Sequence, residues 1–317
     1  MSFFTDSKVA VTGGAGFIGS HLVRKLRSLG ASVIVIDKAL PFMPLKELVS
    51  GPPIQYERHN LGTDNPKSLA DILDGVDYVF HLAAEKHHLG KDPELILRTN
   101  VRGTAELLQA VKKVGVKKLV FTSSLYAYGR MTAPRMTETE RPHPTTPYGE
   151  SKLVAEHIIH RASVLTRIPM VCTRLFFTYG PGQYNGTGYK SVIVKNFERI
   201  VEGQRPVIYG NGNQALDYIY VDDVVTALLA AMEHQPTFGV FNVGSGDPTP
   251  IRCLVPLMLA AAGVSLNVEP IYLPSDWTAG TIRVADTEKF ETTFGIRPTV
   301  GLSEGLQRTW EWIINGR

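Results

Sequence analysis

A tyrosine and a lysine stand four positions apart at the start of a predicted helix, in the segment Tyr148-Gly149-Glu150-Ser151-Lys152. Residues at i and i+4 of a helix project from one face, so the ammonium of Lys152 is expected beside the phenol of Tyr148. A neighbouring positive charge favours the phenolate and lowers the pKa of the phenol. The pair therefore predicts that Tyr148 is a general base at neutral pH. Ser124, just beyond a strand predicted to end at Thr122, is expected to hydrogen-bond the reacting hydroxyl and the carbonyl formed from it.

A glycine-rich segment near the N-terminus, Thr12 to Gly19, lies between a predicted strand and a predicted helix. Gly13 permits a tight turn, Gly16 lets backbone N–H groups approach a pyrophosphate, and Gly19 allows close packing at the positive end of the helix. A purely structural glycine turn is the alternative. The position between strand and helix favours a dinucleotide site instead.

Asp37 ends the second predicted strand, about twenty residues beyond the glycines. A carboxylate at this place accepts hydrogen bonds from the adenosine ribose 2'-OH and repels a 2'-phosphate. The sequence therefore favours NAD+ over NADP+, although the adjacent Lys38 weakens the repulsion. The alternative for Asp37 is a carboxylate that only caps a turn.

Six segments occur in the order and spacing of the extended short-chain dehydrogenases: Thr12 to Gly19, His81-Leu82-Ala83-Ala84, Asn100-Val101, Ser123-Ser124, Tyr148 to Lys152 and Tyr179-Gly180-Pro181. Over essentially the whole chain the sequence resembles the NAD-dependent epimerase/dehydratase group of that family, in particular UDP-glucose and UDP-glucuronate 4-epimerases. The resemblance implies a tightly bound NAD and a small-molecule substrate, mainly a nucleotide-diphosphate sugar. It also implies that Lys152 hydrogen-bonds the nicotinamide ribose.

The resemblance further implies which residues form the site. The implied catalytic residues are Ser124, Tyr148 and Lys152. The implied cofactor-binding residues are Gly13, Gly16, Phe17, Ile18, Gly19, Asp37, Lys38, Asn60, Leu61, Leu82, Ala83, Ala84, Lys86, Asn100, Thr122, Ser123, Tyr148, Lys152 and Phe176. The implied substrate-binding residues are Lys86, Ser124, Tyr126, Tyr148, Phe177, Thr178, Lys190, Leu216 and Arg283.

The stretch after the strand-end hydroxyl bears on the reaction. In the 4,6-dehydratases of the family this stretch typically includes an acid that expels water from sugar C6. Here it reads Leu125-Tyr126-Ala127, which disfavours elimination. An epimerase needs no such acid, because hydride passes to NAD and returns to the opposite face of the keto intermediate. Epimerisation, at sugar C4, is therefore expected.

Three departures from the family pattern concern the substrate. Phe177 replaces an Asn or Thr that touches the sugar diphosphate in many members, and Leu216 replaces a phosphate-binding Arg. The segment Trp277-Thr278-Ala279-Gly280 lacks the usual Arg of an Arg-Pro-Gly turn. Such losses remove charge-assisted hydrogen bonds, which Arg283, Lys190 or Arg252 would have to replace.

Two alternatives to the epimerase follow. One is a dehydrogenase or reductase of a sugar, a sugar acid or another substrate without a nucleotide. The other is a non-catalytic dinucleotide sensor, which the complete set of Ser124, Tyr148 and Lys152 disfavours.

The elements that must position these residues alternate between short β-branched runs and longer amphipathic stretches, which is typical of βαβ units around a parallel sheet. The sequence predicts an α/β Rossmann fold with a doubly wound parallel sheet and a smaller, mixed α/β C-terminal substrate lobe. Residues 1–175 and about 214–240 are assigned to the NAD-binding domain, and about 176–213 and 241–317 to the substrate lobe. Predicted strands are 8–12, 33–37, 78–82, 118–122 and 170–175. Predicted helices are 17–29, about 94–114, 148–166, 190–202, 250–262 and 303–314, with a further helix capped by Asp222-Asp223.

Composition narrows the function classes. The chain is 44% hydrophobic and 20% charged, with 33 Lys and Arg against 30 Asp and Glu, which fits an ordinary globular protein. The positive charges form no runs, so no nucleic-acid partner is expected. No apolar run is long enough to span a bilayer and the N-terminus has no signal pattern, so no membrane partner is expected.

Other single residues carry weaker expectations. Cys172 and Cys253 are expected to be buried thiols, which suits the cytoplasm. His81, His87 and His88 lack a recognisable ligand spacing, so no metal is expected. A homodimer is expected through two helices that carry Leu107, Leu108, Val111, Leu153, Val154 and Ile158, although these side chains could instead face the sheet.

Overall fold

The computed structural model describes residues 2–39, 52–86, 92–131, 133–183, 190–234, 238–265, 267–275 and 280–315. The chain divides into two compact units. The first comprises Met1–Arg130, Arg141–Leu175 and Val225–Phe241, and the second comprises Met131–Glu140, Phe176–Val224 and Asn242–Arg317. The assignment of cofactor and substrate to separate domains stays a prediction.

The first unit is built around one sheet. Its strands are β1 (Lys8–Thr12), β2 (Ser32–Asp37), β3 (Ile54–Arg58), β4 (Tyr78–His81), β5 (Lys118–Ser124), β6 (Met170–Leu175) and most of β10 (Phe238–Val243). Its helices are α1 (Phe17–Ser28), α2 (Lys67–Ile72), α3 (Pro93–Leu97), α4 (Gly103–Val114), α5 (Pro147–Thr166) and most of α7 (Val221–Glu233). Two short segments, the π-helical η2 (Arg98–Arg102) and the 3-10 helix η3 (Leu125–Ala127), complete it.

The strands follow the order β10-β6-β5-β4-β1-β2-β3, and the pairings from β3 through β6 are parallel. The chain moves from β1 toward β2 and β3 and then returns to place β4 on the other side of β1. This reversal is the topological switch point where doubly wound sheets bind ligands beyond the carboxyl ends of their strands. The predicted Rossmann fold class is confirmed.

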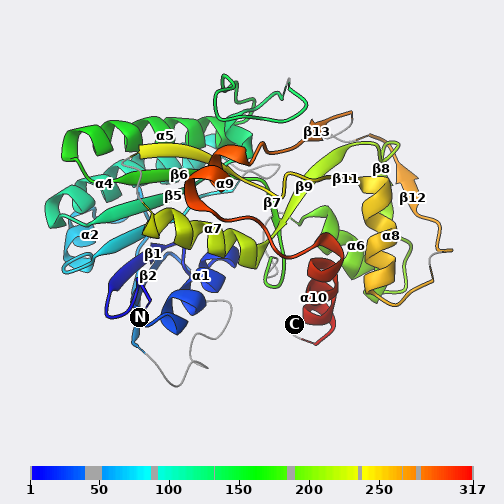
Figure 1. Cartoon of the computed structure of the whole chain (residues 1–317), viewed down its shortest axis with the longest axis horizontal. Helices are drawn as coiled ribbons and strands as arrows, with labels where there is room; N and C mark the ends of the chain where they lie inside the picture. Colours follow the sequence, from blue (N-terminus) through cyan, green and yellow to red (C-terminus); the bar gives the residue numbers. More distant parts are fainter. Residues whose placement is uncertain are drawn as a thin grey trace. The chain divides into compact units, whose positions relative to one another are not determined.

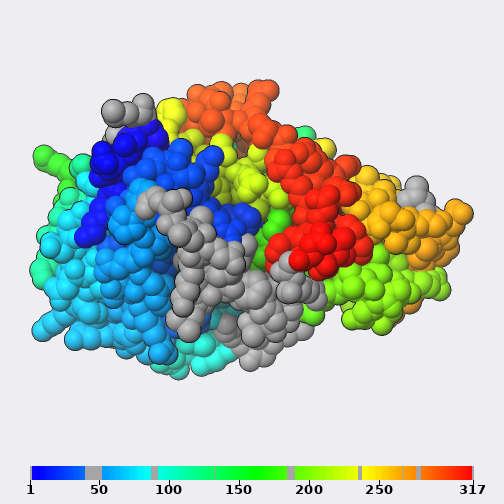
Figure 2. Space-filling view, turned by 90° about the horizontal axis from the view of Figure 1, so that it is seen from below, coloured from blue at the N-terminus to red at the C-terminus, as the bar shows by residue number. Residues whose placement is uncertain are grey.

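Helices cover both faces of this sheet: α2, α4 and α5 lie on one face, and α1 and α7 on the other (Figure 1). Central strands such as Val33–Ile36 are buried on both faces, which explains why they read as continuous apolar runs. Seen from below, N-terminal residues coloured blue to cyan make up much of the surface of this unit (Figure 2).

The predicted elements of the first unit are largely confirmed, with three differences. β5 continues through Ser124 instead of ending at Thr122, because Ser123 and Ser124 still pair with β6. The helix predicted at 94–114 is interrupted by η2. At this point the carbonyl oxygen of Arg98 lies close to Gly62, and a Cβ added to Gly62 would be 2.3 Å from that oxygen. The two edge strands β3 and β10 and the short helix α2 were not predicted.

The second unit contains a four-stranded sheet formed by β7 (Phe177–Tyr179), β9 (Ala215–Tyr220), β11 (Pro248–Pro250) and β13 (Ile282–Arg283), and a pair formed by β8 (Val207–Tyr209) and β12 (Ile271–Leu273). Its helices are α6 (Val192–Val201), α8 (Ile251–Ala261), α9 (Glu288–Phe294) and α10 (Leu302–Asn315). The mixed α/β composition is as predicted, since β11 runs antiparallel to β9 while β7 and β13 run parallel to it.

A buried carboxylate holds this second unit together. Asp217 on β9 is fully buried and accepts hydrogen bonds from the backbone N–H groups of Ser245, Gly246 and Ala285 at 2.6–3.0 Å. Burial raises the pKa of Asp217, and these donors oppose the rise. The carboxylate therefore ties two separate segments, Ser245-Gly246 and Ala285, to the central strand.

The structure decides three further expectations: the burial of the two cysteines, the capping of α7, and the direction of the apolar side chains on α4. Cys172 is buried as predicted, but Cys253 is exposed, because it lies on the solvent side of α8. Asp223 lies in the first turn of α7 and does not cap it; its carboxylate accepts hydrogen bonds from the N–H groups of Thr299 and Val300 at 2.9 and 3.0 Å. Leu107, Leu108 and Val111 pack in the core of the first unit, so they face the sheet.

Some expectations fall outside the described residues. These are the histidines His87 and His88 and the segment Trp277 to Ala279. Within the described ranges, no helix combines the length and the apolar character that a membrane span requires.

Candidate active site

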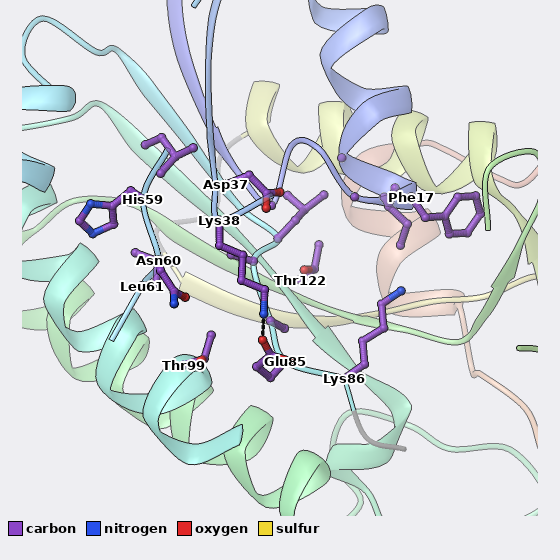
Figure 3. A pocket seen from close by; sticks show the side chains of 18 residues that line it. Phe17, Asp37, Lys38, His59, Asn60, Leu61, Glu85, Lys86, Thr99 and Thr122 are labelled. Atoms are coloured by element: carbon purple, nitrogen blue, oxygen red, sulfur yellow. Dashed lines mark ion pairs between the residues drawn. The ribbon is translucent and has the colours of Figure 1, made fainter. Parts of the chain in front are cut away.

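A pocket of about 230 Å³ opens at the carboxyl ends of β1, β2, β4 and β5 in the first unit (Figure 3). Its position at the switch point of the sheet is the one where a dinucleotide is expected. The residues that line it are Gly13, Gly16, Phe17, Ile18, Gly19, Ile36, Asp37, Lys38, His59, Asn60, Leu61, Leu82, Ala83, Ala84, Glu85, Lys86, Thr99 and Thr122.

The glycines at this pocket are required by close backbone contacts. Gly13 has a positive φ of 71°, and a Cβ there would lie 2.6 Å from the backbone nitrogen of Ala83. A Cβ on Gly19 would lie 2.2 Å from the carbonyl oxygen of Gly13. Side chains at either position would push the loop away from α1 and from the end of β4.

The amino end of α1 borders the same pocket. Gly16 is the N-cap residue and places no side chain over the helix end, and the first turn holds no acidic residue. Backbone N–H groups at a helix N-terminus attract phosphate groups, and an acid in this turn would compete with that attraction. The loop and helix end therefore suit a pyrophosphate.

The predicted ribose acid, Asp37, lies at the end of β2 beside the glycine loop. Its carboxylate accepts hydrogen bonds from the N–H groups of Ala15 at 3.1 Å and Ala39 at 3.0 Å. Its neighbour Lys38 extends to Glu85 and forms an ion pair with it (Figure 3). Asp37, Lys38 and Glu85 all line the pocket.

Two further polar atoms at the pocket also fit a bound ligand. Thr99 Oγ1 and His59 Nε2 are buried and have no hydrogen-bond partner among the described residues. Such atoms are costly to bury unless something satisfies them. The glycine cradle, the helix end and these atoms together fit a dinucleotide.

The proposed catalytic residues converge in the first unit from β5 and α5. The N-cap Thr146 accepts a hydrogen bond from the N–H of Gly149 at 3.1 Å, and Pro147 opens the helix, so Tyr148 and Lys152 occupy its first turns. The ring of Tyr126 stands edge-on to that of Tyr148, with centroids 5.8 Å apart. Gly149 allows this approach, because a Cβ there would lie 2.2 Å from the carbonyl oxygen of Tyr126.

Lys152 is directed toward the strand that borders the pocket. Its Nζ donates a hydrogen bond to the carbonyl of Thr122 at 2.9 Å and lies 5.8 Å from the centre of the Tyr148 ring. Because Thr122 lines the pocket, this bond connects the lysine to the cofactor side of β5.

The expected lowering of the Tyr148 pKa is wrong for this structure. Burial raises the pKa of Tyr148 to about 12, and only the hydrogen bond with Ser124 opposes it. Burial also lowers the pKa of Lys152 to about 7, against the opposing charge of Glu156. The i, i+4 spacing of Tyr148 and Lys152 predicts that they share a helix face. It does not reveal that both side chains lose solvent on folding, which is what shifts their pKa values.

A network of buried polar side chains lies next to the Tyr148–Lys152 segment and holds it in place. Glu156 and Arg174 form a bidentate ion pair at 2.7 and 3.0 Å, and each side chain is less than 5% exposed. Ser123 Oγ donates to Glu156, and the guanidinium of Arg174 lies 4.4 Å from the centre of the Tyr128 ring. These contacts join α5, β5 and β6 around the catalytic segment.

Asn100 connects the pocket to α5. Its Oδ1 accepts from the N–H of Glu85 at 2.7 Å, and its Nδ2 donates to the carbonyl of Glu85 and to Ser151 Oγ. The interruption of the helix at η2 places this side chain in position. Such π-helical turns are frequent at functional sites.

Most cofactor-binding residues expected from the sequence line the pocket together. Asn100, Ser123, Tyr148 and Lys152 belong to the same unit but are not among the lining residues, and Phe176 belongs to the second unit. Sequence reasoning missed Ile36, His59, Glu85 and Thr99. Each of these is next to a residue that was expected to bind the cofactor. Their position beside the motifs is therefore the feature of the sequence that could have identified them.

The remaining substrate-binding candidates belong to the second unit. Leu216 is buried on β9 and Phe177 is partly buried on β7, beside Tyr218. Lys190 forms an ion pair with Glu198 at 2.8 Å, and Arg283 pairs with Leu216 in the sheet. Thr178 Oγ1 donates to the carbonyl of Phe176 at 3.3 Å.

The described residues include no evident metal centre. Across the ranges that the structure describes, no three His, Cys, Asp or Glu side chains gather where they could hold an ion. His81 is buried between two hydroxyls, with Nδ1 2.7 Å from Thr12 Oγ1 and Nε2 2.9 Å from Thr104 Oγ1. It therefore acts as a packing residue of the core.

Known proteins resemble the chain over nearly its whole length. It is 32% identical to a dTDP-glucose 4,6-dehydratase of Streptomyces griseus, over 95% of this chain and 92% of that protein. It is also 32% identical to a putative UDP-glucose 4-epimerase of Methanocaldococcus jannaschii, over 97% and 98% of the two chains. A UDP-N-acetyl-alpha-D-glucosaminuronate decarboxylase of Bacillus cytotoxicus is 30% identical over 95% and 96%.

Solved structures agree with these relatives. The UDP-glucose 4-epimerase of Thermotoga maritima with UDP-glucose matches with a TM-score of 0.84 and 33% identity, covering 97% of this chain and 98% of that one. The UDP-glucuronic acid 4-epimerase of Bacillus cereus in complex with NAD matches with a TM-score of 0.84 and 29% identity, covering 97% and 99%.

The model of one protein family matches residues 9–244, a span that includes the glycine loop, the pocket and the Tyr148–Lys152 pair. The relatives differ in the reaction they carry out but share this family. The chain belongs to the NAD dependent epimerase/dehydratase family.

Proposed function

We propose that this protein is an NAD-dependent epimerase of a nucleotide-diphosphate sugar that inverts sugar C4 through a transient keto intermediate. The observation that carries the proposal is the environment of Tyr148. Ser124 and Tyr126 stand against it, and the η3 segment that follows Ser124 holds no carboxylate.

In the proposed reaction, Tyr148 acts as a phenolate, which the positive charges of bound NAD+ and Lys152 would favour against the effect of burial. It removes the proton of the C4 hydroxyl while Ser124 hydrogen-bonds the same oxygen as it becomes a carbonyl. NAD+, when bound, supplies a reversible acceptor for the C4 hydride. Gly13, Gly16 and the amino end of α1 would hold its pyrophosphate, Asp37 its adenosine ribose and Lys152 its nicotinamide ribose. Return of the hydride to the opposite face of C4, together with return of the proton from Tyr148 to the carbonyl oxygen, completes the inversion with no net oxidation.

Two other reactions known among the relatives begin with the same oxidation. Elimination of water needs an acid near sugar C6, and Leu125 and Ala127 are buried apolar residues where the family's dehydratases carry one. Decarboxylation needs a uronic acid, because oxidation at C4 then gives a β-keto acid that loses carbon dioxide. The η3 segment therefore favours epimerisation over elimination, and the mass of the product separates epimerisation from decarboxylation.

A second candidate is an NAD-dependent dehydrogenase or reductase of a sugar or sugar acid without a nucleotide. The specific observation in its favour is the buried Leu216, which gives no charge to a diphosphate. Lys190 is engaged by Glu198, so its charge is partly neutralised.

One experiment separates these candidates. Native mass spectrometry first determines whether the purified protein carries NAD, and a panel of nucleotide sugars and free sugar acids is then scored by product mass and by isomer separation. We expect an isomer of unchanged mass. Loss of water would indicate a dehydratase, loss of carbon dioxide a decarboxylase, and a gain or loss of two hydrogens a net oxidoreductase.

Three finer statements are also proposals. Asp37 at the pocket supports a preference for NAD+ over NADP+. The two cysteines are free thiols, which suits the reducing cytoplasm. Leu153 and Val154 are only partly buried on α5 and remain available for the helix bundle of a homodimer, whereas Ile158 packs against the core of the first unit.

A further inference from the structure

The cofactor pocket contains a pair of opposite charges that come from distant parts of the chain. Lys38 follows Asp37 at the end of β2, and Glu85 follows the Leu82-Ala83-Ala84 segment after β4. Both line the pocket, and the lysine side chain extends from the Asp37 side of the pocket to the glutamate (Figure 3). The pair therefore lies beside the carboxylate proposed to bind the adenosine ribose.

Glu85 is the fixed partner. Its side chain is 4% exposed, whereas that of Lys38 is 51% exposed. Asn100 holds both the N–H and the carbonyl of Glu85 at 2.7 and 3.1 Å, so the backbone at this position is restrained. A buried carboxylate needs a compensating charge, and Lys38 supplies one. The flexible lysine is thus drawn toward a stationary acid.

Lys38 directly follows Asp37, the carboxylate proposed to bind the adenosine ribose. A free ammonium at this place would weaken the selectivity for NAD+ over NADP+. Asp37 repels a 2'-phosphate, but an adjacent ammonium can receive that group as a point charge. A phosphate monoester carries about −1.5 to −2 at neutral pH, so the balance of nearby charges matters. With Lys38 engaged by Glu85, the three residues carry a net negative charge.

We propose that Glu85 is a cofactor-selectivity residue, which excludes a 2'-phosphate by holding the Lys38 ammonium in an ion pair. This inference rests on the proposed function of the pocket as an NAD site. Selectivity for NAD+ over NADP+ then depends on two acids, Asp37 and Glu85. Glu85 acts through Lys38, whose ammonium it holds.

The test measures binding and needs no substrate. After removal of bound cofactor, the dissociation constants of NADH and NADPH are measured by titration calorimetry for the wild type and for Glu85→Gln, which removes the charge and keeps the shape. We expect the ratio of NADPH to NADH affinity to rise roughly tenfold in Glu85→Gln. The gain should disappear in the double variant with Lys38→Met, because the released ammonium is then absent.

Two controls complete the design. Glu94→Gln removes the same charge from an exposed position on α3, and its ratio should equal that of the wild type. Glu85→Ala removes the charge without introducing an amide and provides a second test if Glu85→Gln does not fold, as judged by circular dichroism.

The outcomes distinguish the inference from the proposal beneath it. A wild type that binds NADPH more tightly than NADH would overturn the NAD preference itself. If the wild type prefers NADH but both Glu85 variants leave the ratio unchanged, or weaken both cofactors equally, Glu85 only maintains the pocket and our inference is wrong.

Discussion

Tyr148 is the residue on which the proposed chemistry depends, because its hydroxyl is the group that exchanges a proton with the substrate. We predict that Tyr148→Phe lowers kcat by about 10²- to 10⁴-fold. Bound NAD should be retained, since Tyr148 is not among the residues that line the pocket. Turnover is measured with the substrate identified in the panel, and bound cofactor by native mass spectrometry. Turnover at the wild-type rate would remove Tyr148 from the mechanism.

His81 is a residue whose burial has a consequence for stability. Burial lowers its pKa to about 3, with a smaller contribution from the charge of Lys152. In the unfolded chain a histidine has a pKa of about 6.5. Below that pH the unfolded state binds more protons than the folded state, so the free energy of unfolding falls as the pH drops.

We therefore predict that between about pH 7 and about pH 5 the wild type loses stability more steeply than His81→Asn, which cannot be protonated in this range. Urea unfolding at several pH values measures both slopes. His157→Asn, a change of an exposed histidine on α5, serves as the control and should keep the wild-type slope. Equal slopes for wild type and His81→Asn would show that His81 is not buried in its neutral form.

At the scale of elements, the joint between α5 and β6 depends on the Glu156–Arg174 pair. Removing one partner of a buried ion pair leaves an uncompensated charge, which costs about 3–5 kcal/mol. We predict this loss in the free energy of unfolding for Glu156→Ala, measured by urea titration. The double variant Glu156→Leu with Arg174→Leu should lose much less than the sum of its single changes.

Arg161→Ala is the matched control for this prediction, because Arg161 is an exposed residue of the same helix. Its stability should remain within about 0.5 kcal/mol of the wild type. A Glu156→Ala variant as stable as the control would mean that solvent reaches the pair and that it does not join the two elements.

The sequence predicts elements well where local pattern decides them. β1, β2, β4 and β6 are short apolar runs between amphipathic helices, and they form as expected. The edge strand β3 was missed because Ile54-Gln55-Tyr56-Glu57-Arg58 mixes polar and apolar residues without a clear buried face. The two- and three-residue strands β13 and β7 exist only through their pairing with β9, which no local pattern encodes.

The same limit applies to the candidate site. Motif residues such as Gly13, Gly19 and Asp37 could be named from the sequence, because the turn they form is local. The ion pair of Lys38 with Glu85 could not, since it follows from strand order. The raised pKa of Tyr148 follows from its burial, which spacing along α5 does not reveal.

At the scale of the whole molecule, we expect a homodimer that uses α5. Leu107, Leu108 and Val111 pack in the core and Ile158 packs against it, so the contact would have to involve the partly buried Leu153 and Val154. We predict that Val154→Arg shifts the protein from dimer to monomer in sedimentation velocity, because a charge would be buried in an apolar contact. Circular dichroism should be unchanged. A wild type that sediments as a monomer would contradict the expectation.

Cys253 is exposed on α8, whereas the other cysteine of the chain, Cys172, is fully buried. A maleimide dye should therefore attach at a single place in the native protein without any engineered substitution. The label would be attached to the second unit, which carries the candidate substrate residues Phe177, Thr178, Lys190, Leu216 and Arg283. A change in its emission when candidate sugars are added would report ligand arrival there independently of turnover.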